Sequence, residues 1–328
     1  MAETVAFGAV GPFGACGEWL RCQLHCHTTR SDGKPEPDDL VRHYADAGFD
    51  AVAITDHWLI TAAEAGPDGP LMIPASELSA DLARAPFEAE VLALGIDALP
   101  EPCAAFPTIA ACAAWIAERG GAAVLAHPRW SALTADDILP ATALHGLEVY
   151  NGGCALEQGN GLADAVWDAV SERGLLLGAV ATDDAHRAGD AAGSDSLLGW
   201  TMVRARERSA AGVVEALRRG HAYGSTGPAI HHVERVPGGL EVACSSAAAV
   251  ALISGPWDGG RVSADPARAA YRARILERDD AGLIVRAHLE EPEFCAWGRV
   301  EVDAADGGRA WTGPIGLPGA RAPHRPGG

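Results

Sequence analysis

Basic residues are scarce in this sequence of 328 residues. Lys and Arg number 25 against 44 Asp and Glu, so the formal net charge is −19 at pH 7. Proteins that bind nucleic acids without sequence preference do so mainly through Lys and Arg on phosphate, so this balance argues against that class. It does not exclude a small anionic substrate, because bound metal ions can reverse the local electrostatic field.

Long apolar runs are also missing. The N-terminus has neither the basic segment nor the extended apolar stretch of a signal peptide, and no segment reads as a membrane span. The 8 cysteines are scattered, without a Cys-x-x-Cys pair, which is typical of free thiols in a cytosolic chain. We therefore expect a cytoplasmic protein with no membrane partner and no nucleic-acid partner; the sequence does not decide its oligomeric state.

Short apolar runs alternate with helical patterns through the first two thirds of the chain. This order is typical of an α/β protein whose mostly parallel sheet is covered by helices, and the number of strands favours closure into a barrel. The predicted strands are 19–24, 50–55, 71–75, 90–95, 122–126, 146–151 and 175–181, and the predicted helices are 35–48, 109–119, one beginning at 134, and 161–173.

The pattern changes near residue 229, beyond which short strands follow one another with Gly, Pro and Asp turns between them. Such a pattern predicts a small antiparallel β-sandwich. The domain prediction is therefore an irregular segment over residues 1–18, a barrel over 19–228, the β-sandwich over 229–315 and a disordered tail over 316–328.

Potential metal ligands follow the predicted barrel strands. His25 and His27 come directly after the first strand, where alternation places both imidazoles on one side, and active sites of such barrels lie at the carboxyl ends of the strands. Eight imidazole and carboxylate ligands exceed the needs of one metal and suit two or three divalent ions, with Mn²⁺, Zn²⁺ or Fe²⁺ favoured by the mixed donors. The predicted ligands are His25, His27, Asp32, His57, Glu77, His127, Asp184 and His186.

Neighbouring polar residues leave alternatives open. Asp183 is an alternative to Asp184, although the Asp-x-His spacing favours Asp184, and Asp56 is expected to point away and to orient a ligand. Arg129 follows a predicted ligand and is placed to bind a phosphate or carboxylate, although a solvated loop arginine is an equal interpretation. Asn151 is predicted to line the substrate pocket.

The order of these motifs resembles the polymerase and histidinol phosphatase (PHP) family. His25-x-His27, Thr55-Asp-His57, Glu77, His127-Pro and Asp184-x-His186 look like its successive motifs. The resemblance implies a distorted (β/α)7 barrel and metal-dependent hydrolysis, mostly of phosphoesters. It also implies three metal positions, which are held by His25, His27, Glu77 and Asp184; by Glu77 and His127; and by Asp32, His57 and His186.

One position departs from the family pattern. A further histidine usually follows Glu77 in the next strand, and Leu92 stands at its place in this sequence. Because leucine cannot bind a metal, we expect a weakened second position and a count of two divalent ions, or three. Segments 199–203, 217–228 and 310–315 are similar to the CehA/McbA branch, named for carbaryl hydrolase, which appends a β-sandwich to the barrel.

The sequence therefore predicts a metal-dependent hydrolase that uses metal-activated hydroxide. A phosphoesterase acting on a small, anionic ester is the first choice, with Glu77, His127 and His186 as catalytic residues and Arg129 and Asn151 as substrate-binding residues. A carboxylic or carbamic ester hydrolase with the same site is the alternative. A non-catalytic binding protein on the same barrel is the third possibility.

Overall fold

The computed structural model describes residues 8–82 and 88–317. The first seven residues and most of the predicted disordered tail lie outside this range. The chain divides into two compact units, which we call the α/β unit (Cys16–Gly224) and the β unit (the residues up to Ala15 and from Ser225 onward). The boundary was predicted four residues later, and residues 8–15, which were predicted to be irregular, contribute a strand and a 3-10 helix to the β unit.

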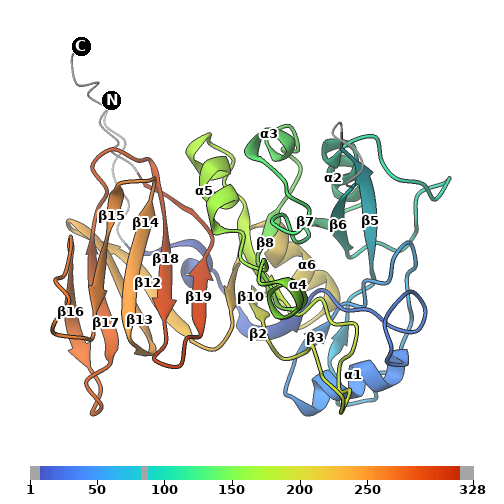
Figure 1. The fold of residues 1–328 in the computed structure, drawn as a ribbon, viewed down its shortest axis with the longest axis horizontal. Helices are drawn as coiled ribbons and strands as arrows, with labels where there is room; N and C mark the ends of the chain where they lie inside the picture. The colour runs from blue at the N-terminus through green and yellow to red at the C-terminus, as the bar shows by residue number, and fades with distance from the viewer. Residues whose placement is uncertain (1–7, 83–87, 318–328) are drawn as a thin grey trace. The chain divides into compact units, whose positions relative to one another are not determined.

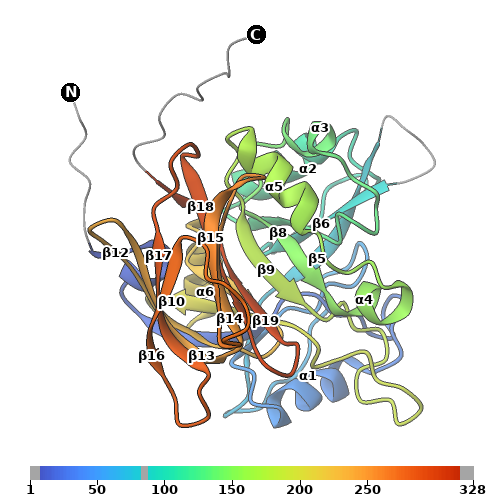
Figure 2. The same cartoon turned by 60° about the vertical axis from the view of Figure 1, so that its left-hand side comes forward.

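The α/β unit contains helices on different sides of its strands, with α1 opposite α2, α3 and α5 in both views (Figures 1 and 2). The helices are α1 (Pro37–Asp46), α2 (Ile109–Glu118), α3 (Ala135–Ile138), α4 (Gly152–Gln158), α5 (Asp164–Glu172) and α6 (Ala210–Arg218). The strands are β2 (Glu18–Gln23), β3 (Ala51–Val52), β4 (Leu71–Met72), β5 (Ala75–Asp81), β6 (Glu88–Leu94), β7 (Ala122–Leu125), β8 (Gly146–Asn151), β9 (Gly178–Thr182), β10 (Trp200–Ala205) and β11 (Ala222–Ser225).

These strands form two groups, in the orders β5-β6-β7-β8-β9 and β11-β10-β2-β3-β4. The mixed α/β class is confirmed. The predicted closed barrel is not confirmed, because neither sheet closes on itself. The expectation of a mostly parallel sheet is also wrong at β6, which is antiparallel to both β5 and β7. The segment from Asp81 to Glu88 is too short for the crossover that parallel neighbours need, so β6 must return alongside β5.

Two seams join the sheets without continuous ladders. At one seam an isolated parallel bridge pairs Cys26, just beyond β2, with Ala185, just beyond β9. At the other, His57 beyond β3 pairs with Glu77 in β5. The strand ends that the sequence marked as ligand-bearing are therefore brought together at the seams.

Apolar side chains fill the space below the seams. One cluster is completely or almost completely buried and includes Leu20 of β2, Leu92 and Leu94 of β6, and Val124 of β7. The amphipathic helix α1 places Leu40, Val41 and Tyr44 against a second cluster. Packing of these faces stabilises the unit and holds the strand ends at fixed positions.

The strands of the β unit form two antiparallel groups, of which the first is a five-stranded sheet, and their buried and exposed residues alternate, as in β12. The sheet orders are β1-β12-β13-β17-β16 and β15-β14-β18-β19, with β20 paired to β18. The elements are β1 (Gly8–Ala9), the 3-10 helix η1 (Gly11–Gly14), β12 (Ile230–Val236), β13 (Gly239–Ala247), β14 (Ala249–Ser254), β15 (Asp258–Ser263), β16 (Ala273–Arg278), β17 (Ile284–Glu290), β18 (Trp297–Asp303), β19 (Arg309–Thr312) and β20 (Ile315–Gly316).

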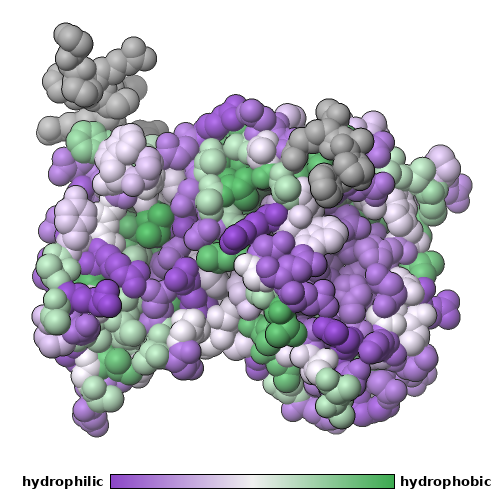
Figure 3. Space-filling view, viewed as in Figure 1, coloured by the Kyte–Doolittle hydropathy of each residue, from purple (hydrophilic) through white to green (hydrophobic). Residues whose placement is uncertain are grey.

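Most of the surface that faces the viewer in Figure 3 is hydrophilic, and hydrophobic residues form small separate groups there. Among the described residues, no helix combines the length and the hydropathy that a membrane span requires.

Candidate metal centre

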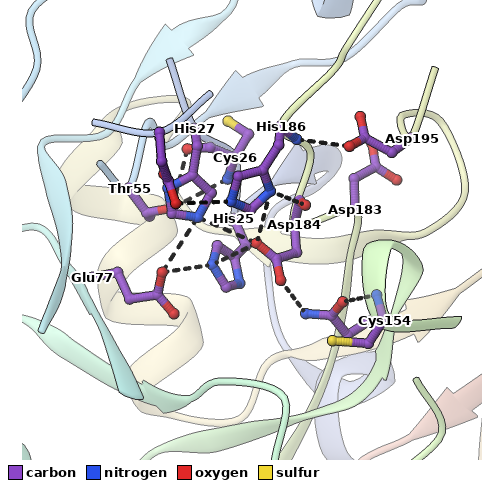
Figure 4. A network of polar contacts seen from close by, with 12 residues as sticks. His25, Cys26, His27, Thr55, Glu77, Cys154, Asp183, Asp184, His186 and Asp195 are labelled. Carbon is purple, nitrogen blue, oxygen red and sulfur yellow. Dashed lines mark hydrogen bonds and ion pairs between the residues drawn. The ribbon is translucent and has the colours of Figure 1, made fainter. Parts of the chain in front are cut away.

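A chain of backbone hydrogen bonds positions the ligands across both seams. The amide of Asp184 donates to the carbonyl of His25 (3.0 Å), and the amide of Glu77 donates to the carbonyl of Thr55 (3.2 Å). The amide of Thr55 in turn donates to the carbonyl of Cys26 (2.9 Å). Each ligand-bearing segment is thus tied to the next, and the side chains converge on one point (Figure 4).

The first position is formed by two imidazoles and two carboxylates. His25 Nε2 lies 3.1 Å from both Glu77 Oε2 and Asp184 Oδ1, and His27 Nε2 lies 3.3 Å and 3.2 Å from the same two oxygens. Metal–ligand bonds of about 2.1 Å separate adjacent ligands by roughly 3.0–3.4 Å. The four atoms therefore have the spacing of a coordination shell.

The second position adjoins the first through the other oxygen of Glu77. His127 Nε2 lies 3.2 Å from Glu77 Oε1 and 3.4 Å from Glu90 Oε2. His57 Nδ1 lies 3.5 Å from Glu77 Oε2 and from Glu90 Oε1. The predicted pairing of Glu77 with His127 is thus present, together with a carboxylate that was not among the predicted ligands.

The third position is more open. Asp32 Oδ2 lies 3.5 Å from the Nε2 atoms of His57 and His186, and Asp32 Oδ1 lies 3.5 Å from His27 Nδ1. All eight predicted ligands therefore lie in one contiguous cluster. His57 presents one ring nitrogen to each of the last two positions, so as a neutral imidazole it can bind a metal at only one of them.

His27 tests whether this cluster fits metal ions. Its side chain is buried, and neither of its ring nitrogens has a hydrogen-bond partner within the described residues. A buried polar atom without a partner is costly, whereas a nitrogen that binds a metal has its lone pair occupied. The donor set, its spacing and this buried histidine all fit divalent ions.

Three other histidines are oriented by bonds on their second nitrogen. His25 Nδ1 lies 2.8 Å from Glu148 Oε1, His127 Nδ1 lies 3.1 Å from Ser131 Oγ, and His186 Nδ1 lies 3.0 Å from the carbonyl of Asp184. Such bonds fix the ring so that Nε2 faces the metal, as is usual for metal-binding histidines. Glu148 is completely buried and was not identified from the sequence, because a single Glu within an apolar strand has no distinguishing pattern.

Backbone strain accompanies the ligands. His127 (φ 26°) and Asp184 (φ 53°) adopt positive φ values, which are rare for residues other than glycine and recur at functional sites. Gly33 lies close behind the loop of His27, where a Cβ atom would be 2.4 Å from the His27 carbonyl carbon. A larger residue at position 33 would displace that loop.

Without metal, protons balance the carboxylates. Burial alone would lower the pKa of His27 and His127, but the nearby carboxylates of Asp184 and Glu77 outweigh it and raise these pKa values to about 10 and about 9. Burial alone would likewise raise the pKa of Glu77 and Asp184, but the surrounding histidines, His25 foremost, hold both pKa values below the usual range. Burial together with the Glu77 carboxylate raises the pKa of Glu90 to about 8.

These pKa shifts predict that protons and metal compete. A raised histidine pKa stabilises the metal-free fold fully below the unfolded value near 6.5, and this stabilisation is lost as pH rises toward 9 to 10. Metal binding needs neutral imidazoles, so it strengthens over the same range. We expect the unfolding temperature in EDTA to fall between pH 6.5 and pH 9, and the rise in unfolding temperature that Mn²⁺ produces to become larger over the same range. Thermal unfolding at several pH values, with and without Mn²⁺, measures both effects. Unfolding temperatures that change in parallel with pH in the two conditions would contradict this prediction.

All of the predicted ligands except His25 line a pocket of about 240 Å³. Its described lining residues include Trp130, Glu157 and Asp195 besides the ligands, but neither lysine nor arginine. Arg129 does not line the pocket and donates to the carbonyl of Leu162 (3.4 Å). Asn151 is buried, caps α4, and donates to Glu148 Oε2 (2.8 Å) and Asp184 Oδ2 (3.1 Å). The two predicted substrate-binding residues therefore do not face the pocket.

The structure also distinguishes between adjacent acids. The Asp183 carboxylate accepts hydrogen bonds from the Tyr44 hydroxyl (2.8 Å) and from the amides of residues 197–199, so it clamps a loop and is not aimed at the metals. Asp56 accepts from the amide and the hydroxyl of Thr28 (2.8 and 2.6 Å) and thereby holds the loop that carries Asp32. Asp56 therefore supports the loop of a predicted ligand, in line with the expectation that it orients a ligand and does not bind metal itself.

Glu90 is the ligand-type residue that the sequence pattern did not predict. Apart from Glu77, which lies within β5, the predicted ligands follow the carboxyl ends of strands. Glu90 lies near the amino end of β6, which the antiparallel direction brings to the same edge. Leu92, two residues along the same face of the strand, pairs in register with Glu77 and packs into the apolar core. The sequence did contain a signal for Glu90: it stands two residues before Leu92, so side-chain alternation places both on the same face of the strand.

Comparison with known proteins gives a partial family match. A family model for the PHP domain matches residues 23–99, which include His25, His27, Asp32, His57, Glu77 and Glu90. No curated protein matches.

Solved structures that resemble this chain include three that are each 17% identical to it. A two-domain protein from Bacteroides vulgatus, containing a predicted PHP-like metal-dependent phosphoesterase, aligns over 95% of this chain and 98% of its own, with a TM-score of 0.48. A candidate metal-dependent phosphoesterase from Bifidobacterium adolescentis aligns over 53% of this chain and 90% of its own (TM-score 0.38). An amidohydrolase from Chromobacterium violaceum with bound sulfate aligns over 52% and 88% (TM-score 0.39).

The family match ends at residue 99, before His127, Asp184 and His186. These three predicted ligands are placed in the cluster by its geometry alone. Membership of the CehA/McbA branch stays a prediction. Residues 23–99 thus match the PHP domain, and the rest of the α/β unit completes the cluster of potential metal ligands that this segment begins.

Proposed function

We propose that this protein is a metal-dependent hydrolase, and specifically a phosphoesterase that acts on a small anionic ester. The observation that carries the proposal is the buried His27, whose ring nitrogens face carboxylates of two positions without a hydrogen bond. Bound divalent ions would lower the pKa of a coordinated water and offset the charge that develops on the ester. We include the PHP-type barrel and the CehA/McbA-like branch in this proposal.

The pocket chemistry supports dependence on metal. Among the described residues, the pocket is lined by carboxylates and imidazoles but by no lysine or arginine. Without metal, the pocket therefore repels an anionic substrate. Bound cations reverse that field. The acidic pocket is therefore suited to an anionic ester only when it is loaded with metal.

The residues have separate tasks in this proposal. Glu77 and His127 hold two adjacent positions together, and both are almost fully buried. His186 is more exposed, and its Nδ1 is occupied by the carbonyl of Asp184. When only two positions are filled, the imidazolium form of His186 can donate its Nε2 proton to the leaving oxygen while Nδ1–H stays bonded to the Asp184 carbonyl, which is general-acid catalysis. Trp130 packs edge-on against His127 and forms an apolar wall for the leaving group.

A substrate panel tests the reaction class. Metal-free protein reloaded with Mn²⁺, Fe²⁺ or Zn²⁺ should hydrolyse nitrophenyl phosphate or bis-nitrophenyl phosphate at least about 100-fold faster than the EDTA-treated protein. Nitrophenyl acetate and a nitrophenyl carbamate serve as the comparison. Metal-dependent esterase activity without phosphatase activity would contradict the phosphoesterase and favour the alternative.

The alternative is a carboxylic or carbamic ester hydrolase at the same site. The open third position and the exposed Trp130 favour it, because a neutral aromatic ester needs an apolar surface more than a cation. A non-catalytic binding protein predicts that the purified protein holds no stoichiometric metal.

A further inference from the structure

Glu90 occupies a defined place beside the second metal position. Its carbonyl accepts a hydrogen bond from the amide of Ala126 (3.0 Å), which is the residue before His127. On the other side, Glu90 pairs in register with Ser79, two residues beyond Glu77. The backbone on both sides of β6 thus fixes Glu90 between two strands that carry ligands.

The Glu90 side chain reaches two histidines with separate oxygens. Oε1 lies 3.5 Å from His57 Nδ1 and Oε2 lies 3.4 Å from His127 Nε2. Ligand atoms of His57, Glu77 and Glu90 all lie within 4.8 Å of one another. The side chain is mostly buried, so two carboxylates face each other out of solvent, an arrangement that is costly without a cation between them.

Leu92 pairs in register with Glu77 but offers no ligand atom. It is completely buried among apolar side chains, whereas Glu90 lies two residues, or about 6.6 Å, along the same strand. We expected Leu92 to leave the second position one ligand short. Glu90, which lies on the same face of β6, can supply the missing ligand.

We propose that Glu90 is a ligand of the second metal position, where it gives an oxygen-rich donor set with Glu77 and directs one oxygen toward His57 and the other toward His127. This inference rests on the proposed metal-dependent function. Two carboxylates and one imidazole favour Mn²⁺ or Fe²⁺, relative to Zn²⁺, more strongly than a second imidazole in the same place would. Glu90 thus tunes the metal preference of this chain, and His57 remains available to the third position through Nε2.

Metal titration of the full chain tests this. Metal-free wild type, Glu90→Gln, Glu90→His and the control Glu88→Gln are dialysed against Mn²⁺ or Zn²⁺, and bound metal is counted by mass spectrometry. Glu88 begins the same strand but is exposed, so its substitution changes the charge without reaching the cluster. Electron paramagnetic resonance of the Mn²⁺-loaded proteins reports whether two ions are coupled.

We expect Glu90→Gln to weaken one Mn²⁺ equivalent by at least about 10-fold and to lose the coupled signal, while the first equivalent stays bound and shows that the variant folds. Glu90→His should lower the ratio of Mn²⁺ to Zn²⁺ affinity by at least about 10-fold, and Glu88→Gln should match wild type. Unchanged Mn²⁺ binding and coupling in Glu90→Gln would overturn this inference alone. A wild type that binds neither metal would overturn the proposed function itself.

Discussion

Replacing Glu77 by Ala is expected to reduce the bound metal from two or more ions per chain to at most one and to abolish hydrolysis. Its Oε2 atom lies 3.1–3.3 Å from the Nε2 atoms of His25 and His27, and its Oε1 atom lies 3.2 Å from His127 Nε2. One carboxylate is thus shared by two positions. Loss of both metals' charge stabilisation should reduce turnover by at least about 1,000-fold, which corresponds to about 4 kcal/mol.

Metal content by mass spectrometry on purified protein is the direct measurement for Glu77→Ala. Glu118→Ala is a matched control, because this acid lies at the exposed end of α2 in the same unit. Full metal content in the Glu77 variant would show that the two positions do not share a ligand. If the variant kept its turnover without bound metal, the reaction would not depend on metal.

Glu148→Gln is expected to have the second large effect although Glu148 touches no metal position. Oε1 lies near His25 Nδ1 (2.8 Å) and accepts from the Thr182 hydroxyl (2.5 Å), and Oε2 accepts from the amide of His127 (2.7 Å) and from Asn151 (2.8 Å). All four partners of this buried carboxylate act as donors. An amide retains only one acceptor oxygen, so its NH₂ group would face two donors.

The expected cost of Glu148→Gln is roughly 1–3 kcal/mol for each donor left unsatisfied. Because His25 and His127 lose their fixed orientation, metal affinity should also fall by about 10- to 100-fold. Thermal unfolding in EDTA measures the first effect, and metal titration of the folded variant measures the second. Glu172→Gln on the exposed side of α5 is the control. An unchanged unfolding temperature would contradict the assigned hydrogen bonds.

The sequence was informative where chemistry follows strand order. His25 and His27 are two residues apart at the end of β2, and Asp184 and His186 repeat that spacing beyond β9. Their types and spacing, together with their recurrence at successive predicted strand ends, indicate metal ligands, because parallel strands present their carboxyl ends at one edge. The change to an all-β pattern beyond residue 229 was similarly visible from turn residues.

Long-range geometry was not visible in the sequence. The antiparallel direction of β6 brings Glu90 to the edge where the other strands end, and this direction depends on how the chain returns from β5. Arg129 and Asn151 were placed at the correct strand ends, but Arg129 donates to the Leu162 carbonyl and Asn151 to Asp184, and neither lines the pocket. Nothing in the sequence predicts such directions, since each is set by the partner that the side chain finds.

The sequence by itself determined which residue types could bind metal and the order in which the strands present them. Only the tertiary structure decided which carboxylates serve the metals and which serve other residues. Asp184 and Asp183 are adjacent, yet one faces His25 and His27 while the other accepts the amides of residues 197–199. The physical reason is that a carboxylate's role depends on the donors around it, and those donors come from segments far apart in the chain.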